Sequence, residues 1–362
     1  MTISFLIGNG FDLNLGLNTT FSSFLDCYTK ENANDTEMIE RFKKSILKDK
    51  KRWSDAEIAF GEYTEVFRRE GKSADDYYEC YDDFCEQLAK YLETQEKRID
   101  FGSQSKETAE AFSKSISISN ILSNQTEVQQ NQLTSSFEKF GEGFHFNFID
   151  FNYTTTLDSC ISHLRKYSGI LGERVYSRTR YSNSISNLIH VHGYTSRSMV
   201  LGVNDIGQLA DAELFSGFGE EYVDQLIKIK ANGLNEENTD RKAAEVIKQS
   251  DLIYIYGMSL GDTDKLWWGR IMQRMIQQPN MHLIIHSHSA PKTALLPRKN
   301  RTWVNRTKNA FIEKAGKELT EDQRKTIFER IHIDGKNIFE PLKDLKEHPD
   351  IRNISEARPA VV

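Results

Sequence analysis

The chain has 362 residues, of which 38% are hydrophobic and 28% are charged, a composition typical of globular rather than disordered proteins. Its 47 Lys and Arg against 53 Asp and Glu give a formal net charge of −6, which excludes a uniformly basic nucleic-acid binder but not a local basic patch. The apolar runs are far shorter than the roughly 20 residues that cross a bilayer, and no charged n-region of a signal peptide precedes the first one. We therefore expect a soluble, cytoplasmic protein without membrane contacts.

Short apolar runs that end in glycine or polar residues predict the buried strands of a parallel sheet. They lie at residues 2–7, 144–152, 188–192, 199–203, 252–256, 281–287 and 331–333. The amphipathic stretch 241–251 predicts a helix that leads into the strand at 252–256. This alternation of helix and buried strand predicts an α/β protein, with a Rossmann-like (sirtuin-like) parallel sheet core and large α-helical insertions.

The predicted strands are far apart in the sequence, so the core must be assembled from distant segments. We expect residues 1–34, 142–205 and 241–335 to form a nucleotide-binding α/β core. Residues 35–141 are predicted to be a helical insertion, whose Ser-, Gln- and Asn-rich part at 101–135 indicates a mobile link or an exposed helix pair. Residues 206–240 are predicted to be a smaller helical insertion, and residues 336–362 a loosely attached C-terminal tail. The four cysteines are too scattered for a disulfide framework, so free thiols are expected.

The densest motif, Gly8-Asn9-Gly10-Phe11-Asp12, directly follows the first predicted strand. A glycine pair at this place lets the backbone approach phosphates, and the N-terminus of a following helix favours an anion. The Gly-x-Gly-x-x-Gly fingerprint fails here, because Leu13 stands where it needs its third glycine. The motif alone therefore leaves two interpretations open, a nucleotide-binding loop and a structural tight turn.

That motif, continued by residues 16–25, resembles the opening of the bacteriophage abortive-infection AbiH family. Further motifs that resemble this family follow in order: Trp53-Ser54-Asp55 with Glu57 and Gly61, Phe151-Asn152-Tyr153-Thr154, His190-Val191-His192-Gly193, residues 200–205 and residues 256–264. The ordered set covers most of the chain to about residue 290. The resemblance implies an antiphage defence effector, and it leaves room for a phage-derived trigger, a companion defence protein or a homo-oligomer.

At a greater distance, the same set resembles the sirtuin-like NAD-binding fold. Gly8 and Gly10 match the first sirtuin loop, Asn152 matches an asparagine, and His192-Gly193 matches the catalytic histidine pair. Gly257 and Ser259 match the ribose-binding loop. The zinc-binding cysteine module of sirtuin deacetylases has no counterpart, so the resemblance implies cleavage of NAD rather than protein deacetylation.

These resemblances imply an NAD glycohydrolase that releases nicotinamide and ADP-ribose, with NAD as the substrate and no metal. The implied catalytic residues are Asn152, to position a water or the ribose hydroxyls, His192 as a general base, and Asp12, to bind the ribose or the carboxamide. The pKa of an unperturbed histidine, about 6.5, would need little adjustment for this role. The implied cofactor-binding residues are Gly8, Asn9, Gly10, Phe11, Gly193, Asp205, Gly257, Ser259, Leu260 and Asp262.

Several alternatives stay open at this point. A metal-dependent nuclease acting on DNA or RNA would use Asp12, Asp205, Asp262 and Asp264, and a non-catalytic module would bind a nucleotide and signal to a partner. Gly257-Met258-Ser259-Leu260-Gly261 satisfies the nucleophile-elbow pattern of a hydrolase. The histidines at 282, 286 and 288 share strand parity, which places them on one face of a strand and suggests a metal site. The basic run at 41–52 indicates a solvated helix face or a nucleic-acid contact.

Overall fold

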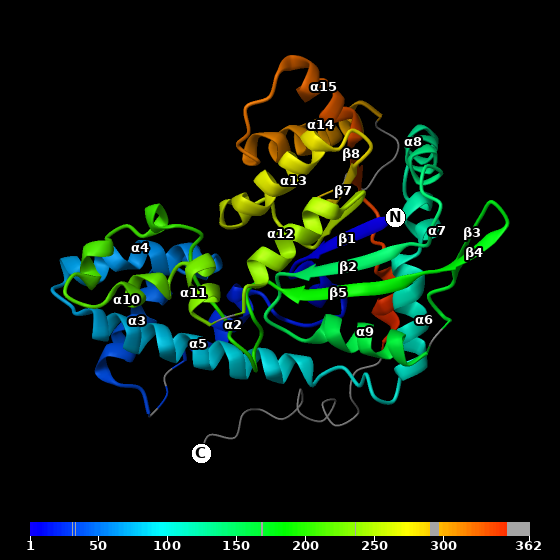
Figure 1. Ribbon diagram of the computed structural model, residues 1–362. Coiled ribbons are helices and arrows are strands. Elements are labelled where there is room, and N and C mark those ends of the chain that lie inside the picture. Colours follow the sequence, from blue (N-terminus) through cyan, green and yellow to red (C-terminus); the bar gives the residue numbers. More distant parts are fainter. Residues whose placement is uncertain (31, 33, 168, 236, 290–296, 346–362) are drawn as a thin grey trace.

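A six-stranded parallel sheet lies at the centre of the computed structural model, which describes residues 1–345 except 31, 33, 168, 236 and 290–296 (Figure 1). Its strands are β1 (Thr2–Ile7), β2 (His145–Asp150), β5 (Ser184–His190), β6 (Leu252–Tyr256), β7 (His282–His286) and β8 (Ile331–Asp334). They lie in the order β5-β2-β1-β6-β7-β8, and every neighbouring pair is parallel. Along the chain, this is the 3-2-1-4-5-6 order of dinucleotide-binding sheets, which confirms the predicted α/β class with a Rossmann-like core.

Both faces of the sheet are buried, which explains why its strands appear in the sequence as continuous apolar runs. Phe5 of β1 lies between Phe148 of β2 and Tyr254 of β6 in the register, and the Phe5 and Phe148 ring centroids are 5.1 Å apart. On this face the sheet packs against helices α6 (Ser105–Ile116) and α9 (Thr156–Lys166). Leu6 of β1 faces the opposite core, with α12 (Thr239–Gln249) and α13 (Lys265–Gln277). Alternate residues of one strand thus belong to two separate cores.

Helices cover the two faces in separate groups. The first core contains α6 (Ser105–Ile116), α7 (Ile118–Ser123), α8 (Glu127–Phe137), α9 (Thr156–Lys166) and the short 3-10 helix η5 (Glu340–Asp344). The second contains α12 (Thr239–Gln249), α13 (Lys265–Gln277), α14 (Pro297–Lys314) and α15 (Glu321–Arg330). Helix α1 (Gly10–Asn14) is a short helix directly after β1.

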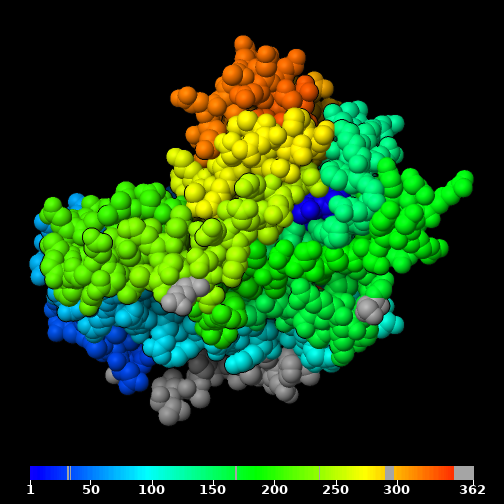
Figure 2. Space-filling model, viewed as in Figure 1, coloured from blue at the N-terminus to red at the C-terminus, as the bar shows by residue number. Residues whose placement is uncertain are grey.

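A helical lobe lies beyond the carboxyl ends of β1, β2 and β5 (Figure 1). It contains α2 (Phe21–Tyr28), α3 (Glu37–Lys48), η1 (Arg52–Ser54), α4 (Ala56–Arg69), α5 (Ala74–Glu96), η2 (Ile206–Gln208), η3 (Ala212–Phe215), α10 (Glu220–Asp224) and α11 (Lys228–Leu234). Buried aromatic residues such as Trp53 and Phe84 pack there with Leu226. Figure 2 shows the later segment, in green, lying beside the blue and cyan helices. Two insertions that are distant in sequence therefore share one core.

Three local predictions differ from the structure. Residues 199–203 form no strand, because Leu201 and Val203 are buried in the helical lobe and Val203 makes only an isolated bridge with Ile227. Residues 101–135 are neither a mobile link nor an exposed pair, because their helices bury Phe112 and Ile121 against the sheet. The predicted tail is anchored at its start, where Phe339 is fully buried; residues 346–362 lie outside the described residues.

The sequence pattern also missed a hairpin, β3 (Glu173–Tyr176) and β4 (Thr179–Ser182), which projects from the body of the protein (Figure 1). Its turn residues Ser177 and Arg178 have φ angles of 47° and 69°. Turns of this kind usually carry Gly, Asn or Asp, so the turn gave no signal. Within the described residues, no helix is both long and apolar enough to cross a membrane.

Candidate functional site

A pocket of about 320 Å³ opens where β1, β2 and β6 end. Strand-end residues such as Gly8, Asn152 and Gly257 form one wall, and Thr20 and Asp55 from the helical lobe contribute to the other. The next strand of the sheet along the chain, β2, lies on one side of β1, and β6 lies on the other. The strand order reverses at this point, so the pocket lies at the switch point of the sheet. Ligands of open α/β sheets bind at this place.

The glycines of the first motif allow two loops to pack against each other. The Gly10 N–H donates a 2.9 Å hydrogen bond to the Gly257 carbonyl, and a Cβ on Gly10 would lie 2.4 Å from the Gly257 Cα. A Cβ on Gly8 would lie 2.5 Å from Met258 Cγ. Because the N–H of Gly10 and that of Phe11, which bonds to the Gly8 carbonyl, are both occupied, neither is free to receive a phosphate. The structure thus gives the glycine pair a packing role.

Asp12 lines the pocket, but both of its carboxylate oxygens are already bonded. The hydroxyls of Thr154 and Thr156 donate hydrogen bonds of 2.8 and 2.6 Å to it, and the residue is only 1% exposed. Burial raises the pKa of Asp12 to about 6, and the two threonine hydrogen bonds limit that rise. Asp12 therefore ties α1 to the loop after β2.

Asn152 and His192 are brought together at the ends of β2 and β5. Asn152 is 5% exposed, and its side-chain Nδ2 has no hydrogen-bond partner among the described residues. An unpaired buried donor is destabilising by about 1–3 kcal/mol, so the Asn152 amide is available to a ligand. Burial, with a smaller effect of Lys228, holds the pKa of His192 well below its ordinary value, so the ring is neutral. This His192 is a weaker base than the unperturbed histidine that the sequence led us to expect.

Asp264 is the carboxylate of the pocket without a partner. It ends the 3-10 helix η4 (Asp262–Asp264), and no described side chain makes a hydrogen bond or ion pair with it. Burial raises the pKa of Asp264 to about 7; the nearby Glu57 and Asp55 add to this rise, and Lys228 opposes it. Such a pKa suits a general acid or base near neutral pH.

Glu57, by contrast, is fully engaged within the protein. Lys228 Nζ donates a 2.6 Å hydrogen bond to Glu57 Oε2, and the Tyr153 hydroxyl donates one of 2.8 Å to Oε1. Lysine and arginine are missing from the described residues that line the pocket, whereas four carboxylates line it. Lys228 neutralises only Glu57, so the pocket as a whole is acidic.

The structure gathers some of the predicted residues and disperses others. The pocket contains Gly8, Asn9, Asp12, Asn152, His192, Gly257 and Ser259. Phe11 lies instead in the core against Phe339, and Leu260 packs against the core that contains α12 and α13. Gly193 lines a separate cavity. Asp205 and Asp262 line a larger groove of about 900 Å³ beside α12 and α13, where Lys314 pairs with Asp262.

The sequence analysis assigned no site to Glu57, Tyr153 and Lys228, and it named Asp264 only in the nuclease alternative. Three of them carried a signal, because Glu57 and Tyr153 belong to family-like motifs and Asp264 ends the last one. Lys228 carried none, since its pairing with Glu57 joins two insertions that are distant in sequence.

The other predicted motifs have local structural explanations. Ser259 lines the pocket, but α13 begins only at Lys265, unlike the helix that directly follows a nucleophile elbow. His286 stacks on Tyr256 with ring centroids 4.6 Å apart, and His282 bonds to His332 at 3.0 Å, so these histidines do not converge. In the basic run, Arg41, Lys44 and Lys50 form ion pairs with acidic side chains on the lobe surface, which favours a solvated helix face.

Comparison with family models identifies the chain. The model for bacteriophage abortive infection AbiH matches residues 4–286, more than three quarters of the sequence and all of the strand ends that form the pocket. No match is found among the curated proteins or among the solved structures. The resemblance to sirtuins stays a prediction. The chain belongs to the bacteriophage abortive infection AbiH family.

Proposed function

We propose that the protein carries out the phage-defence role of its family by hydrolysing NAD to nicotinamide and ADP-ribose. The observation that carries the proposal is the combination, in one switch-point pocket, of an unpaired buried Asn152 amide with an unpaired Asp264 carboxyl whose pKa is about 7. Unpaired polar groups in a cleft, one of them with a shifted pKa, are typical of functional sites.

The charge of the pocket supports a cationic substrate. The nicotinamide ring of NAD carries a positive charge, and the ribose becomes positively charged as its bond to nicotinamide breaks. An acidic pocket stabilises both, whereas it repels a bare polyanion. Phe21, Phe151 and Tyr153 also line the pocket and offer flat surfaces to the nicotinamide ring. The volume of about 320 Å³ lies at the lower end of the range for small-molecule sites, which suits the nicotinamide riboside half of NAD.

In the proposed reaction, the bond between the ribose C1′ and the nicotinamide nitrogen breaks, and the electron pair goes to the nitrogen. A water molecule adds to C1′ and gives its proton to Asp264. Asn152 holds the water or a ribose hydroxyl with its free amide, and neutral His192 hydrogen-bonds to the ribose. Asp12 is a positioning residue that keeps Asn152's loop in place through Thr154 and Thr156.

Release of nicotinamide from NAD by the purified protein, followed by chromatography, tests the proposal. The assay is run alone and with lysate from phage-infected cells as a source of trigger. We expect release by the wild type, and a loss of about 100-fold or more in Asp264→Asn and Asn152→Ala. Asp322→Asn, an exposed carboxylate on α15, is the matched control. Release that persists unchanged in both pocket variants, or NAD binding without any release, would contradict hydrolysis at this site.

The nuclease alternative receives less support. Of its four proposed carboxylates, Asp12 and Asp264 line the pocket, while Asp205 and Asp262 line the groove beside α12 and α13. Among the described residues, these four do not form a group with the spacing of metal ligands.

A further inference from the structure

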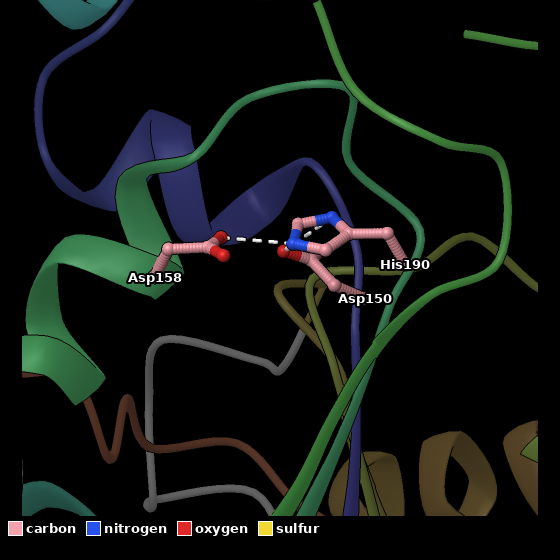
Figure 3. Close-up of side chains that lie close together, drawn as sticks. All are labelled: Asp150, Asp158 and His190. Carbon is pink, nitrogen blue, oxygen red and sulfur yellow. Dashed lines mark hydrogen bonds and ion pairs between the residues drawn. The ribbon is translucent and has the colours of Figure 1, made fainter. Parts of the chain in front are cut away.

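Three chemistry-bearing side chains meet behind the pocket, outside the residues that line it. They are Asp150, the last residue of β2, Asp158 of α9, and His190, the last residue of β5 (Figure 3). Each offers one ligand atom, and these atoms all lie within 4.8 Å of one another. Parallel strands β2 and β5 end side by side, so the fold itself brings Asp150 and His190 together.

Within the part of the chain that the structure describes, two buried atoms of this cluster have no hydrogen-bond partner. They are Asp150 Oδ2, in a residue with no exposed surface, and His190 Nδ1, in a residue that is 9% exposed. The two atoms lie 3.8 Å apart, too far for a hydrogen bond between them. The other oxygen of Asp150 accepts a 3.0 Å hydrogen bond from the Asn152 N–H, so only Oδ2 remains unpaired.

Asp158 approaches the imidazole from its other side. Its Oδ2 lies 2.8 Å from His190 Nε2. In the neutral ring with its proton on Nε2, the carboxylate shares that proton and the lone pair is on Nδ1. Histidine ligands of metal ions commonly have this arrangement, in which a carboxylate behind the ring fixes its tautomer and orientation.

We propose that a divalent cation binds between Asp150 Oδ2 and His190 Nδ1, with Asp158 as the carboxylate that orients the imidazole. Metal bonds of about 2.0–2.2 Å to both atoms span a separation of 3.8 Å at an open angle. The cation supplies both unpaired atoms with a partner and compensates the buried carboxylate. One imidazole and one carboxylate favour a first-row ion such as Zn²⁺ or Mn²⁺ over Ca²⁺.

The surroundings offer room for water ligands. His190 also lines a cavity of about 240 Å³ next to the Gly193 turn, which includes Tyr194 and Thr239. Thr239 Oγ1 there is buried without a hydrogen-bond partner among the described residues. Water in this cavity completes the coordination of the ion. Because Asp150 also holds the Asn152 backbone, the cation stabilises the loop that forms one wall of the pocket.

The test is calorimetric titration of the EDTA-treated full chain with ZnCl₂ and, separately, with MnCl₂. We expect one ion per chain for at least one of the metals, and loss of that binding in His190→Ala and Asp150→Asn. Asp158→Asn should weaken it by about 10-fold or more, because the ring loses its orienting carboxylate. The control is His332→Gln. This variant removes one partner of the buried contact between His282 and His332, and it should leave metal binding unchanged.

A second measurement uses the wild type alone, in case a variant fails to fold. In protein labelled with ¹⁵N-histidine, binding of Zn²⁺ should shift the Nδ1 resonance of His190 while Nε2 keeps its proton. No binding of either metal by the wild type, binding that survives His190→Ala, or a His190 that stays protonated on both nitrogens in saturating Zn²⁺ would overturn the proposal. None of these readouts depends on NAD.

Discussion

The buried Asp12 and the half-buried Asp264 line the same pocket and show how differently the protein can treat two carboxylates. Burial raises the pKa of both, to about 6 for Asp12 and about 7 for Asp264. Two threonine hydroxyls donate to Asp12, whereas Asp264 has no hydrogen-bond partner among the described residues. A carboxylate whose oxygens are satisfied by the protein contributes to stability, and one left unsatisfied beside a cleft is available for chemistry. The sequence placed Asp12 in the NAD site and named Asp264 only in the nuclease alternative, yet the contacts favour Asp264 as the reacting group.

Asp264→Asn should have the largest effect on activity. The amide cannot accept a proton from water, so nicotinamide release should fall by about 100-fold or more. The melting temperature should stay the same or rise, since a half-buried charge without a partner among the described residues is removed. Release and thermal unfolding are measured on the same preparation. A fall in both would mean that Asp264 supports the fold in the way we assign to Asp12.

Asp12→Ala should affect stability first. The substitution leaves the buried hydroxyls of Thr154 and Thr156 without their acceptor, which we expect to lower the free energy of unfolding by about 2–4 kcal/mol. Urea unfolding measures this change. A matched comparison is the double variant Thr154→Val and Thr156→Val, which removes the donors instead. An Asp12→Ala protein that is as stable as the wild type but inactive would contradict the structural role and show that Asp12 takes part in the reaction.

The pH dependence separates the two carboxylates further. The unprotonated form of Asp264 is the base, so activity should rise about tenfold per pH unit up to about pH 7 and then level off. Stability should change in the opposite sense: the folded-state pKa lies above the ordinary value of 3.8, so Asp264 becomes destabilising as pH rises from about 4 to 7. The gain in melting temperature of Asp264→Asn over the wild type should therefore be larger at pH 8.5 than at pH 5. Asp55, Glu57 and Lys228 are the charged groups near Asp264, and a gain that does not change with pH would contradict its raised pKa.

Asp262→Asn should have the smallest effect. Asp262 belongs to the same short 3-10 helix as Asp264, but its exposed carboxylate points to the groove and pairs with Lys314 at 2.5 Å. An exposed ion pair contributes little, so we expect less than a twofold change in nicotinamide release and about 0.5 kcal/mol or less in stability. A large loss of activity would indicate that the groove beside α12 and α13 is part of the functional site.

The sheet could be predicted because burial on both faces leaves a direct trace in the sequence. The runs at 2–7 and 252–256 coincide with β1 and β6. The run at 199–203 is also apolar but is buried in the helical lobe, because an apolar run indicates burial and does not show whether the segment pairs with a strand. The hairpin β3–β4 was missed for the opposite reason, because its residues are largely exposed.

The site was predictable only where its residues directly follow strands. Gly8, Asn152 and Gly257 do so, and the structure places them around one pocket. The lack of a hydrogen-bond or ion-pair partner for Asp264 among the described residues could not be predicted, because it depends on which side chains the helical lobe brings near it. The pairing of Lys228 with Glu57, which leaves Asp264 without a cation, joins segments 171 residues apart.

The most direct test is a crystal structure of Asp264→Asn bound to NAD. We predict that the nicotinamide and its ribose occupy the pocket at the ends of β1, β2 and β6, with the Asn152 amide donating to the ligand and residue 264 near the ribose C1′. NAD bound in the groove beside α12 and α13, or no bound NAD at saturating concentration, would contradict this account of the site.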